Sequence, residues 1–500
     1  MHILPFIRDR FGEQMPAART GFCESCRLTF TPEFNKKTTG SGIGEEMSSS
    51  ENQMPAWASQ SGFVFACIGA AVGLGNIWKF PYMTGVQGGG AFVLIYLASI
   101  FAIAIPIAAA ELVIGRQGRS DAQQAVKNIA LASGRSARFA AIGTLGVLGS
   151  FILLTFYAVI AGWVTAYIVR ALTGALNGLD AASASNLLAG LHAAPGEMIA
   201  HQILFLAVIG LILIRKLNAG LERANLVLIP ALIVMLIGIA IYGAVAGDVG
   251  AALVFLFTPD FSKITPETIQ SAVGHGFFSV GVGAAMLITY GAYLDRQVDL
   301  AKAAITIGIA DTIIALIAGI GVFAIVFGEG LDPTGGPGLI FTTLPLAFSQ
   351  LPGGSALAVI FFTLVFFAAL TSGLSLSEVI IRWAENTFGL SRVKAAILML
   401  GASFGVGLAS VFSFNIWSQV HLFDAGALAG KTLFDVKDYF VTALVMPVCG
   451  LGVVAFASWV APAPMMRAAM GSSALIFNLW LWSARIIAPA GIGWMLWAGL

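Results

Sequence analysis

The sequence predicts an all-α polytopic membrane protein of about eleven transmembrane helices, in which the first and the sixth helix are broken. Three observations lead to this fold class. Only 10% of the residues are charged and 58% are hydrophobic, whereas soluble domains carry about 25% charged residues. From Trp57 onward the chain divides into apolar segments long enough to cross a bilayer. Two of these segments carry Val-Gly-apolar-Gly in their middle.

The first 55 residues differ from the rest of the chain. They are polar and mixed in charge, and they close with GSGIGEEMSSSENQ. No long apolar stretch follows the early arginines, so a cleaved signal peptide is not expected. We predict a disordered cytoplasmic tail over residues 1–55, with Met47 as a possible later start of the chain. Cys23 and Cys26 form a lone Cys-x-x-Cys pair, which does not predict a zinc site.

Apolar segments and charged loops then alternate to the end of the chain. The predicted spans are 58–86, 90–115, 137–172, 198–216, 222–247, 269–293, 300–328, 357–385, 394–412, 434–459 and 468–497. Basic residues cluster after spans 2, 4, 6 and 8, whereas the loops 173–197 and 329–356 have almost none. The positive-inside rule therefore predicts a cytoplasmic N-terminus and an external C-terminus. Spans 1 and 6 cross in opposite senses, as an inverted repeat requires.

The two glycine-containing stretches are GAAVGLGNIWKFP (Gly69–Pro81) and FFSVGVGAAMLITY (Phe277–Tyr290). Glycine destabilises a helix interior, so paired glycines at matching depth predict helices that unwind there. A broken helix presents N–H groups at one half-helix end and C=O groups at the other, which can hold an anion and a cation side by side. The alternative is that small residues merely allow close helix packing. Two such stretches in register favour a secondary transporter.

Several strings carry a family resemblance: WASQSGFVFACIGAAVGLGNIWKFPY, GGGAFVLIYL, ELVIGR, PGLIFTTLPLAF and AALTSGLSLSE. Together they resemble the neurotransmitter:sodium symporter family, and within it the bacterial eleven-span amino-acid transporters. The resemblance covers about residues 57–497 of a transporter domain at 56–500. It implies inverted five-helix repeats at about 57–247 and 269–459 with an eleventh helix at 468–497. It also implies sodium-coupled uptake of an amino acid by alternating access, in a bacterial inner (plasma) membrane.

The resemblance further implies two sodium sites. Sodium is a hard cation that takes several oxygen ligands. The first site would use Ala71, Asn76, Ser279 and Asp311. The second would use Gly69, Val72, Ala368, Thr371 and Ser372. For the two hydroxyls of the second site, hydrogen bonding to their own helix is the alternative role.

Asp311 stands in an apolar run, TIGIADTIIALIAG, where a bare carboxylate costs several kcal/mol. Many relatives carry an amide at this position, and some bring a carboxylate one helical turn later, where this chain has Ala315. Unit charges about 4 Å apart attract by roughly 4 kcal/mol at an effective dielectric of about 20. We therefore expect Asp311 to supply the negative charge itself, with no requirement for chloride. A structural contact to a neighbouring helix is the alternative.

The substrate-binding positions implied by the resemblance hold a zwitterion and surround its side chain. They are Ala70, Ala71, Gly73, Gly75, Leu153, Tyr157, Phe278, Ser279, Gly281, Ala284, Ser372 and Leu376. None is basic, which disfavours a dianionic substrate. Because Gly281 and Ala284 are small, we predict a neutral amino acid with a large apolar or aromatic side chain, unless neighbouring side chains refill the space.

Outer-gate residues also follow from the resemblance. Lys79 and Asp438 occupy the positions of an outer ion pair, and Phe278 and Tyr157 those of an aromatic lid. His275 lies one turn before Phe278, where it would either tune gate closure by titrating or act as a polar packing residue.

The inner gate departs from the family pattern. Met54 and Asn386 stand where relatives have an arginine and an aspartate. Tyr293 and Glu378 remain as candidates for inner closure. Either the inner gate is weaker in this chain, or Glu385 and another partner replace the missing pair.

Other classes of protein are less well supported. The sequence contains no HExxH, no GxSxG and no His/Cys grouping, so we expect no enzyme. The net charge of +1 predicts no nucleic-acid partner. We expect an amino-acid substrate and the lipid bilayer as partners, and infer no obligate protein partner. A transporter of another small zwitterion or amine, a channel, and a substrate-sensing receptor on the same fold stay open.

Overall fold

The computed structural model describes residues 55–294, 298–426 and 428–498. All regular structure within these ranges is helical, which confirms the predicted fold class. The predicted tail, apart from Pro55, lies outside the described residues, as does Met54 of the inner gate.

By length and composition, the described residues contain nine spanning helices and one bent pair that passes as a tenth span, and a second interrupted pair lies at the predicted sixth span. The nine helices are Gly90–Gly118, Ala137–Leu172, Pro195–Leu213, Asn218–Ala246, Leu300–Gly328, Gly354–Phe388, Arg392–Phe412, Leu433–Val460 and Ala474–Ala498. The bent pair is Gln60–Ala71 and Gly75–Val86, with a bend of 45°. The second interrupted pair is α11 (Pro266–Val280) with α12 (Met286–Ala292), separated by Gly281–Ala285. The bounds lie within a few residues of those predicted.

Some crossings consist of one helix, and several others of two helices joined by a π-helical turn. Their bounds are α1 (Gln60–Ala71), α2 (Phe80–Val86), α3 (Gly90–Ser99), α4 (Ile105–Gly118), α6 (Ala140–Leu172), α8 (Pro195–Leu213), α9 (Arg223–Ala246), α13 (Leu300–Gly328), α15 (Gly354–Phe388), α16 (Arg392–Phe412), α17 (Leu433–Tyr439), α18 (Met446–Ala455), α20 (Ala474–Trp482) and α21 (Ala488–Ala498). Shorter helices lie in the connections: α5 (Ala122–Ala132), α7 (Ala181–Ala193), α10 (Val249–Phe257), α14 (Leu344–Gln350) and α19 (Ala463–Met470).

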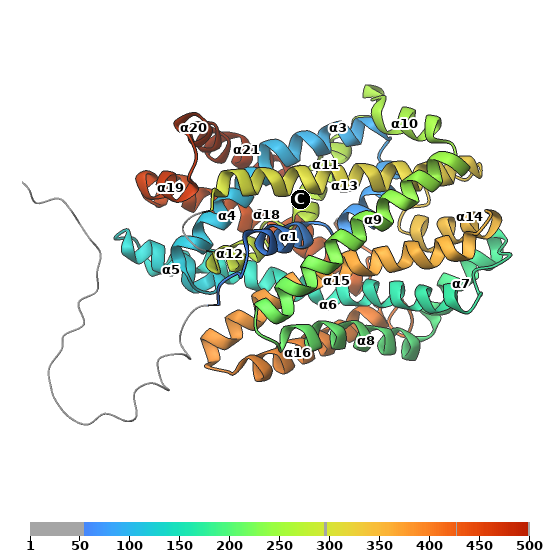
Figure 1. The fold of residues 1–500 in the computed structure, drawn as a ribbon, viewed down its shortest axis with the longest axis horizontal. Coiled ribbons are helices and arrows are strands. Elements are labelled where there is room, and N and C mark those ends of the chain that lie inside the picture. The colour runs from blue at the N-terminus through green and yellow to red at the C-terminus, as the bar shows by residue number, and fades with distance from the viewer. Residues whose placement is uncertain (1–54, 295–297, 427, 499–500) are drawn as a thin grey trace, which may run out of the picture. The chain divides into compact units, whose positions relative to one another are not determined.

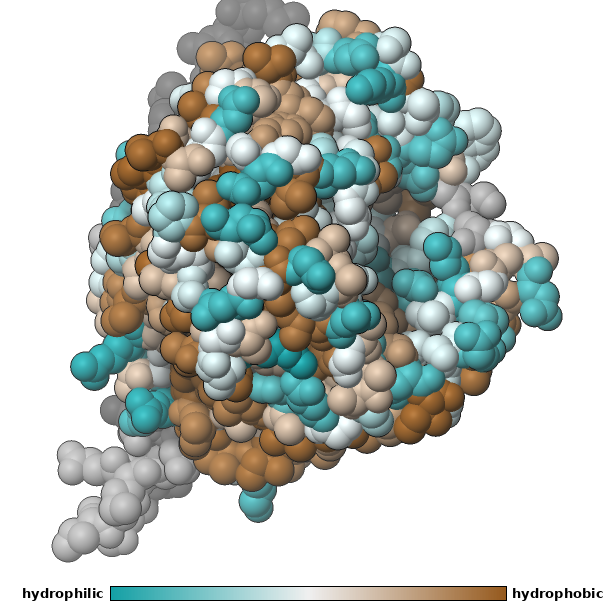
Figure 2. Space-filling view, turned by 90° about the vertical axis from the view of Figure 1, so that its right-hand side faces the viewer, coloured by the Kyte–Doolittle hydropathy of each residue, from teal (hydrophilic) through white to brown (hydrophobic). Residues whose placement is uncertain are grey.

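The broken helices lie inside the bundle. Helix α1 packs against α9, α13 and α15, and α12 packs against α4 and α15 (Figure 1). The most apolar stretches of α6 and α15 are 78% and 72% buried, whereas those of α8 and α9 are only 33% and 28% buried. Helices α6 and α15 therefore belong to the interior, and α8 and α9 present apolar side chains to the surroundings. Figure 2 shows that polar side chains gather on the face at one end of the bundle, which is hollowed.

The break between α11 and α12 has a local cause. Gly281 and Gly283 adopt φ angles of +72° and +82°, a left-handed conformation that favours glycine. A Cβ atom at Gly283 would also overlap the backbone carbonyl of Met446. Ala285 has a φ of +57°, which is strained for a residue with a side chain. Helix α11 thus ends at Val280, and the chain resumes a helix at Met286.

Candidate functional site

The break after α1 is stabilised by side chains. Asn76 Oδ1 accepts a hydrogen bond from the backbone N–H of Gly73 (3.0 Å), and the hydroxyl of Tyr157 on α6 accepts one from Leu74 (3.4 Å). A Cβ atom at Gly73 would overlap Ser372 Oγ on α15. The break therefore brings bare backbone of the first crossing against α6 and α15.

Three residues of the predicted first sodium site meet in one buried cluster. Asn76 Nδ2 donates to Asp311 Oδ1 (2.7 Å) and lies 3.2 Å from Ser279 Oγ. Ser279 Oγ lies 2.9 and 3.0 Å from the two carboxylate oxygens of Asp311. The three side chains come from the first crossing, α11 and α13, and all are buried. Ala71 ends α1 five residues before Asn76 and is also buried.

Tyr96 on α3 is a member of this cluster that sequence reasoning missed. Its hydroxyl donates to Asp311 Oδ2 (3.2 Å) and lies 3.0 Å from Ser279 Oγ. The available signal was a lone tyrosine in the apolar string GGGAFVLIYL. Every described side chain that contacts the Asp311 carboxylate is neutral. A buried carboxylate without a basic partner is costly, so this donor set fits a bound monovalent cation.

The predicted second sodium site gathers oxygens from α1 and α15. Thr371 Oγ1 lies 3.1 Å from the carbonyl of Ala368 and 3.4 Å from that of Val72. Ser372 Oγ lies 3.2 Å from the carbonyl of Gly69 and 3.3 Å from that of Val72. Thr371 also lies 3.1 Å from the carbonyl of Phe367 in its own helix. All five predicted ligands thus converge, and the hydroxyl of Thr371 bonds to its own helix as well.

The second break depends on α4 and α6. Glu111, fully buried on α4, accepts the backbone N–H of Gly283 (2.7 Å), and Ser150 on α6 donates to the carbonyl of Ala284. The sequence showed Glu111 as a lone acid in an apolar span, but we assigned it no role.

The remaining predicted substrate positions lie around these breaks. A Cβ atom at Gly75 would contact the ring of Phe278 at 3.3 Å. Leu153, Tyr157, Ala284 and Leu376 are buried. The carbonyl of Ala70 lies 3.4 Å from Ser372 Oγ.

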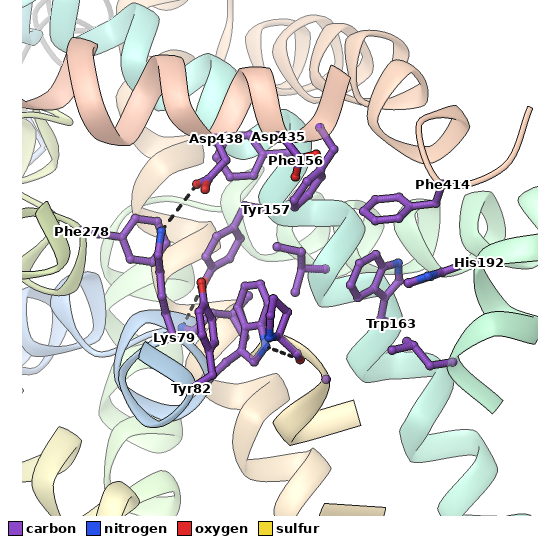
Figure 3. A pocket seen from close by; sticks show the side chains of 17 residues that line it. Lys79, Tyr82, Phe156, Tyr157, Trp163, His192, Phe278, Phe414, Asp435 and Asp438 are labelled. Atoms are coloured by element: carbon purple, nitrogen blue, oxygen red, sulfur yellow. Dashed lines mark hydrogen bonds and ion pairs between the residues drawn. The ribbon is translucent and has the colours of Figure 1, made fainter. Parts of the chain in front are cut away.

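A cavity of about 280 Å³ lies beside the first break, and aromatic side chains form much of its lining (Figure 3). Lys79 Nζ lies 3.7 Å from Asp438 Oδ1 and 4.4 Å from the centre of the Phe278 ring. At the far wall, His192 on α7 contacts Trp163 and Phe414. Burial lowers the pKa of His192 to about 4, so its imidazole is neutral at pH 7 and acts as part of the aromatic wall.

His275 lies inside the bundle. Its ring packs against Phe80, Phe92 and Tyr96, and neither ring nitrogen has a hydrogen-bond partner among the described residues. It also lines a cavity that reaches Lys79.

The predicted inner-gate residues belong to an ion-pair network at the other end of α15. Tyr293 donates to Glu378 Oε1 (2.6 Å), and the guanidinium of Arg392 on α16 binds both oxygens of Glu378. Arg392 also lies 3.6 Å from Glu385, which pairs with Arg382 at 3.2 Å. Sequence reasoning missed Arg392, which had been read only as a basic loop residue that sets orientation.

Asn386 lies beside this network but binds elsewhere. Its Nδ2 donates to Asp121 Oδ2 (2.8 Å) and lies 3.2 Å from Ser120 Oγ. The start of α1 is held by Glu222, which accepts the backbone N–H groups of Ala58 (2.8 Å) and Ser59 (3.1 Å). Asn386 thus hydrogen-bonds Asp121 and Ser120, and Glu222 holds the chain at the start of α1.

The sequence matches a known protein family. A family model described as "Sodium:neurotransmitter symporter family" matches residues 54–189 and 181–460. The chain therefore belongs to the sodium:neurotransmitter symporter family: it is a sodium-dependent membrane transporter of a small molecule, not an enzyme.

Particular relatives agree. The chain is 35% identical to an uncharacterised sodium-dependent transporter, YhdH, of Bacillus subtilis, over 89% of this chain and 97% of that protein. It is 30% identical to an uncharacterised sodium-dependent transporter of Methanocaldococcus jannaschii, over 87% of this chain and 88% of that protein. Among solved structures, MhsT in complex with L-phenylalanine matches with a TM-score of 0.83 and 36% identity, over 89% of this chain and 100% of that one.

The Glu378–Arg392 pair generates a prediction. Glu378→Gln removes the charge that faces Arg392 of α16, and it replaces the charge-assisted hydrogen bond from Tyr293 with a weaker neutral one. We therefore expect α12, α15 and α16 to separate more readily. A cysteine placed near Tyr293 should react faster with a membrane-impermeant thiol reagent. Glu197→Gln is the matched control, because Glu197 pairs with Arg170 (2.9 Å) outside this network. An unchanged rate in Glu378→Gln would contradict a closing role for the pair.

Proposed function

We propose that this chain imports a neutral amino acid with a large apolar or aromatic side chain, coupled to two sodium ions, by alternating access. The membrane is the bacterial plasma membrane, with the N-terminus in the cytoplasm and the C-terminus outside. The observation that carries the proposal is the buried Asn76–Ser279–Asp311 cluster at the breaks of two crossings, with a carboxylate that faces only neutral described partners.

The two predicted sodium sites have different roles in the proposal. Asp311, Ser279 and Asn76 would supply charged and neutral oxygens to the first ion, beside the Gly73–Gly75 backbone and the Tyr157 hydroxyl that would hold a substrate carboxylate. Thr371 and Ser372 would supply hydroxyl oxygens to the second ion, and their contacts with Val72 and Gly69 connect α15 to the end of α1. A bound sodium ion supplies positive charge, which favours the substrate carboxylate and joins helices that move relative to one another.

Sodium-dependent binding tests the proposal. The purified protein should be stabilised thermally by one or a few neutral amino acids in sodium but not in choline buffer. Thr371→Val combined with Ser372→Ala should raise the sodium concentration at half-maximal effect, because two oxygen ligands are lost. Thr144→Val is the control, since the exposed Thr144 hydroxyl bonds only to Ala140 of its own helix (3.1 Å). Equal stabilisation in both buffers would contradict the proposal, and sodium-dependent binding without uptake into vesicles would favour a receptor.

Asp311 supports independence from chloride, because its carboxylate already places a negative charge beside the first sodium site. Uptake should therefore persist when gluconate replaces chloride. Asp311→Asn keeps the size of the side chain but removes the charge, so we expect the variant either to require chloride or to lose sodium-dependent binding. A variant that stays fully active without chloride would show that Asp311 has a structural role.

The size of the substrate side chain depends on Met286 as well as on Gly281 and Ala284. A Cβ atom at Gly281 would overlap the terminal methyl group of Met286, so this flexible side chain occupies part of the space that glycine leaves. The named ligand of MhsT, L-phenylalanine, supports a large apolar substrate.

Two substitutions test this assignment. Met286→Ala should favour larger side chains, such as that of tryptophan over leucine, and Ala284→Phe should favour smaller ones. Each buried methylene contributes about 0.8 kcal/mol, so competition constants should shift about severalfold. Met465→Ala on α19, which carries no proposed pocket residue, is the control. Stronger competition by alanine or glycine than by leucine or tryptophan in the unmodified protein would contradict the size argument.

A further inference from the structure

A buried amide on α9 is left without a role by the sites described above. Asn225 has no solvent-exposed surface and stands in an otherwise apolar stretch, ANLVLIPAL. Its Nδ2 donates to the carbonyl of Leu221 (2.9 Å), one turn earlier in the helix. Because only the NH₂ group can donate to a carbonyl, this bond fixes the orientation of the amide. The oxygen Oδ1 therefore points away from Leu221.

Asn225 Oδ1 is buried and has no hydrogen-bond partner among the described residues. A buried polar atom without a partner costs about 1–3 kcal/mol. Such an atom calls for an explanation, of which a bound ion is one.

The oxygen lies against Gly69, a residue of the proposed second sodium site. A Cβ atom at Gly69 would overlap Asn225 Oδ1, and the same position lies 3.1 Å from Thr371 Cβ. Gly69 and Thr371 are both proposed ligands of the second site. The absence of a side chain at Gly69 therefore lets the amide oxygen of α9 approach α1 at Gly69, on the side where Thr371 of α15 also packs.

We infer that Asn225 supplies a further oxygen to the second sodium site, from the side of α9. An amide oxygen is a hard ligand of the kind that such cations take. The inference rests on the proposed sodium-coupled function. It makes sodium binding depend on three elements, α1, α9 and α15, where the resemblance implied two.

A second contact with α1 lies close to Asn225 in the chain. Three residues earlier, at the N-cap of α9, Glu222 accepts the backbone N–H groups at the start of α1. The crossing that contains α9 thus contacts the start of α1 through Glu222 and Gly69, near the break, through Asn225. A sodium ion shared with Asn225 would add to the contact near the break.

Sodium titrations of the full chain test the inference. The readout is the melting temperature in sodium chloride without amino acid, at constant ionic strength with choline chloride. Asn225→Leu removes the oxygen and should raise the sodium concentration at half-maximal stabilisation about tenfold, as is typical when a partner of a metal site is deleted. Asn225→Asp keeps an oxygen and loses the bond to Leu221, so it should bind sodium as well as the unmodified protein or more tightly.

The pair of variants separates sodium binding from helix stability. If Asn225 serves only its bond to Leu221, the aspartate variant should behave like the leucine variant, and that result would overturn the inference. Gln202→Leu is the matched control, because Gln202 on α8 is also a buried amide without partners in the described structure but is no proposed ligand. Should the leucine variant not fold, a weaker sodium response of the aspartate variant would overturn the inference. No sodium response in the unmodified protein would instead contradict the proposed function itself.

Discussion

Backbone groups released by a helix break must find partners inside an apolar bundle, and this constraint shapes the centre of the protein. Each break takes at least one partner from another crossing. Tyr157 on α6 accepts the N–H of Leu74, and Glu111 on α4 accepts that of Gly283. Because one polar side chain satisfies each group, α4 and α6 carry isolated polar residues at the depth of the breaks. The polar side chains around the breaks, such as Tyr157 and Glu111, therefore help to make the two interruptions possible.

Two buried acids in the same fold are held in opposite ways. Asp311 contacts only neutral donors among the described residues, whereas Glu378 accepts both arms of the Arg392 guanidinium. A buried carboxylate is stabilised by a positive charge. In Glu378 that charge is part of the protein and links α15 to α16, so it serves structure. Asp311 has no such partner among the described residues, and under the proposed function this leaves its carboxylate available to a bound cation.

The sequence was sufficient for the crossings and for much of the candidate site. Apolar length located the spans to within a few residues. The family resemblance indicated Asn76, Ser279 and Asp311, and Asp311 also stood out as a lone carboxylate in an apolar run. The sequence was not sufficient for partners chosen by tertiary packing. Arg392 looked like any basic loop residue, and the space beside Gly281 could not be seen to contain the methyl group of Met286. Periodicity and composition indicate whether a position is buried or exposed, but they do not identify the side chain that contacts it.

At the inner gate, a neighbouring side chain gives Asn386 a contact that the sequence did not predict. Asn386 stands where relatives carry an acid, and its Nδ2 donates to the carboxylate of Asp121 at 2.8 Å. An acid at position 386 would place two like charges together, and unit charges about 4 Å apart repel by roughly 4 kcal/mol at an effective dielectric of about 20. An amide avoids this repulsion and adds a donor. Closure on this side can then rest on Tyr293, Glu378 and Arg392, which join α12, α15 and α16 without an acid at position 386.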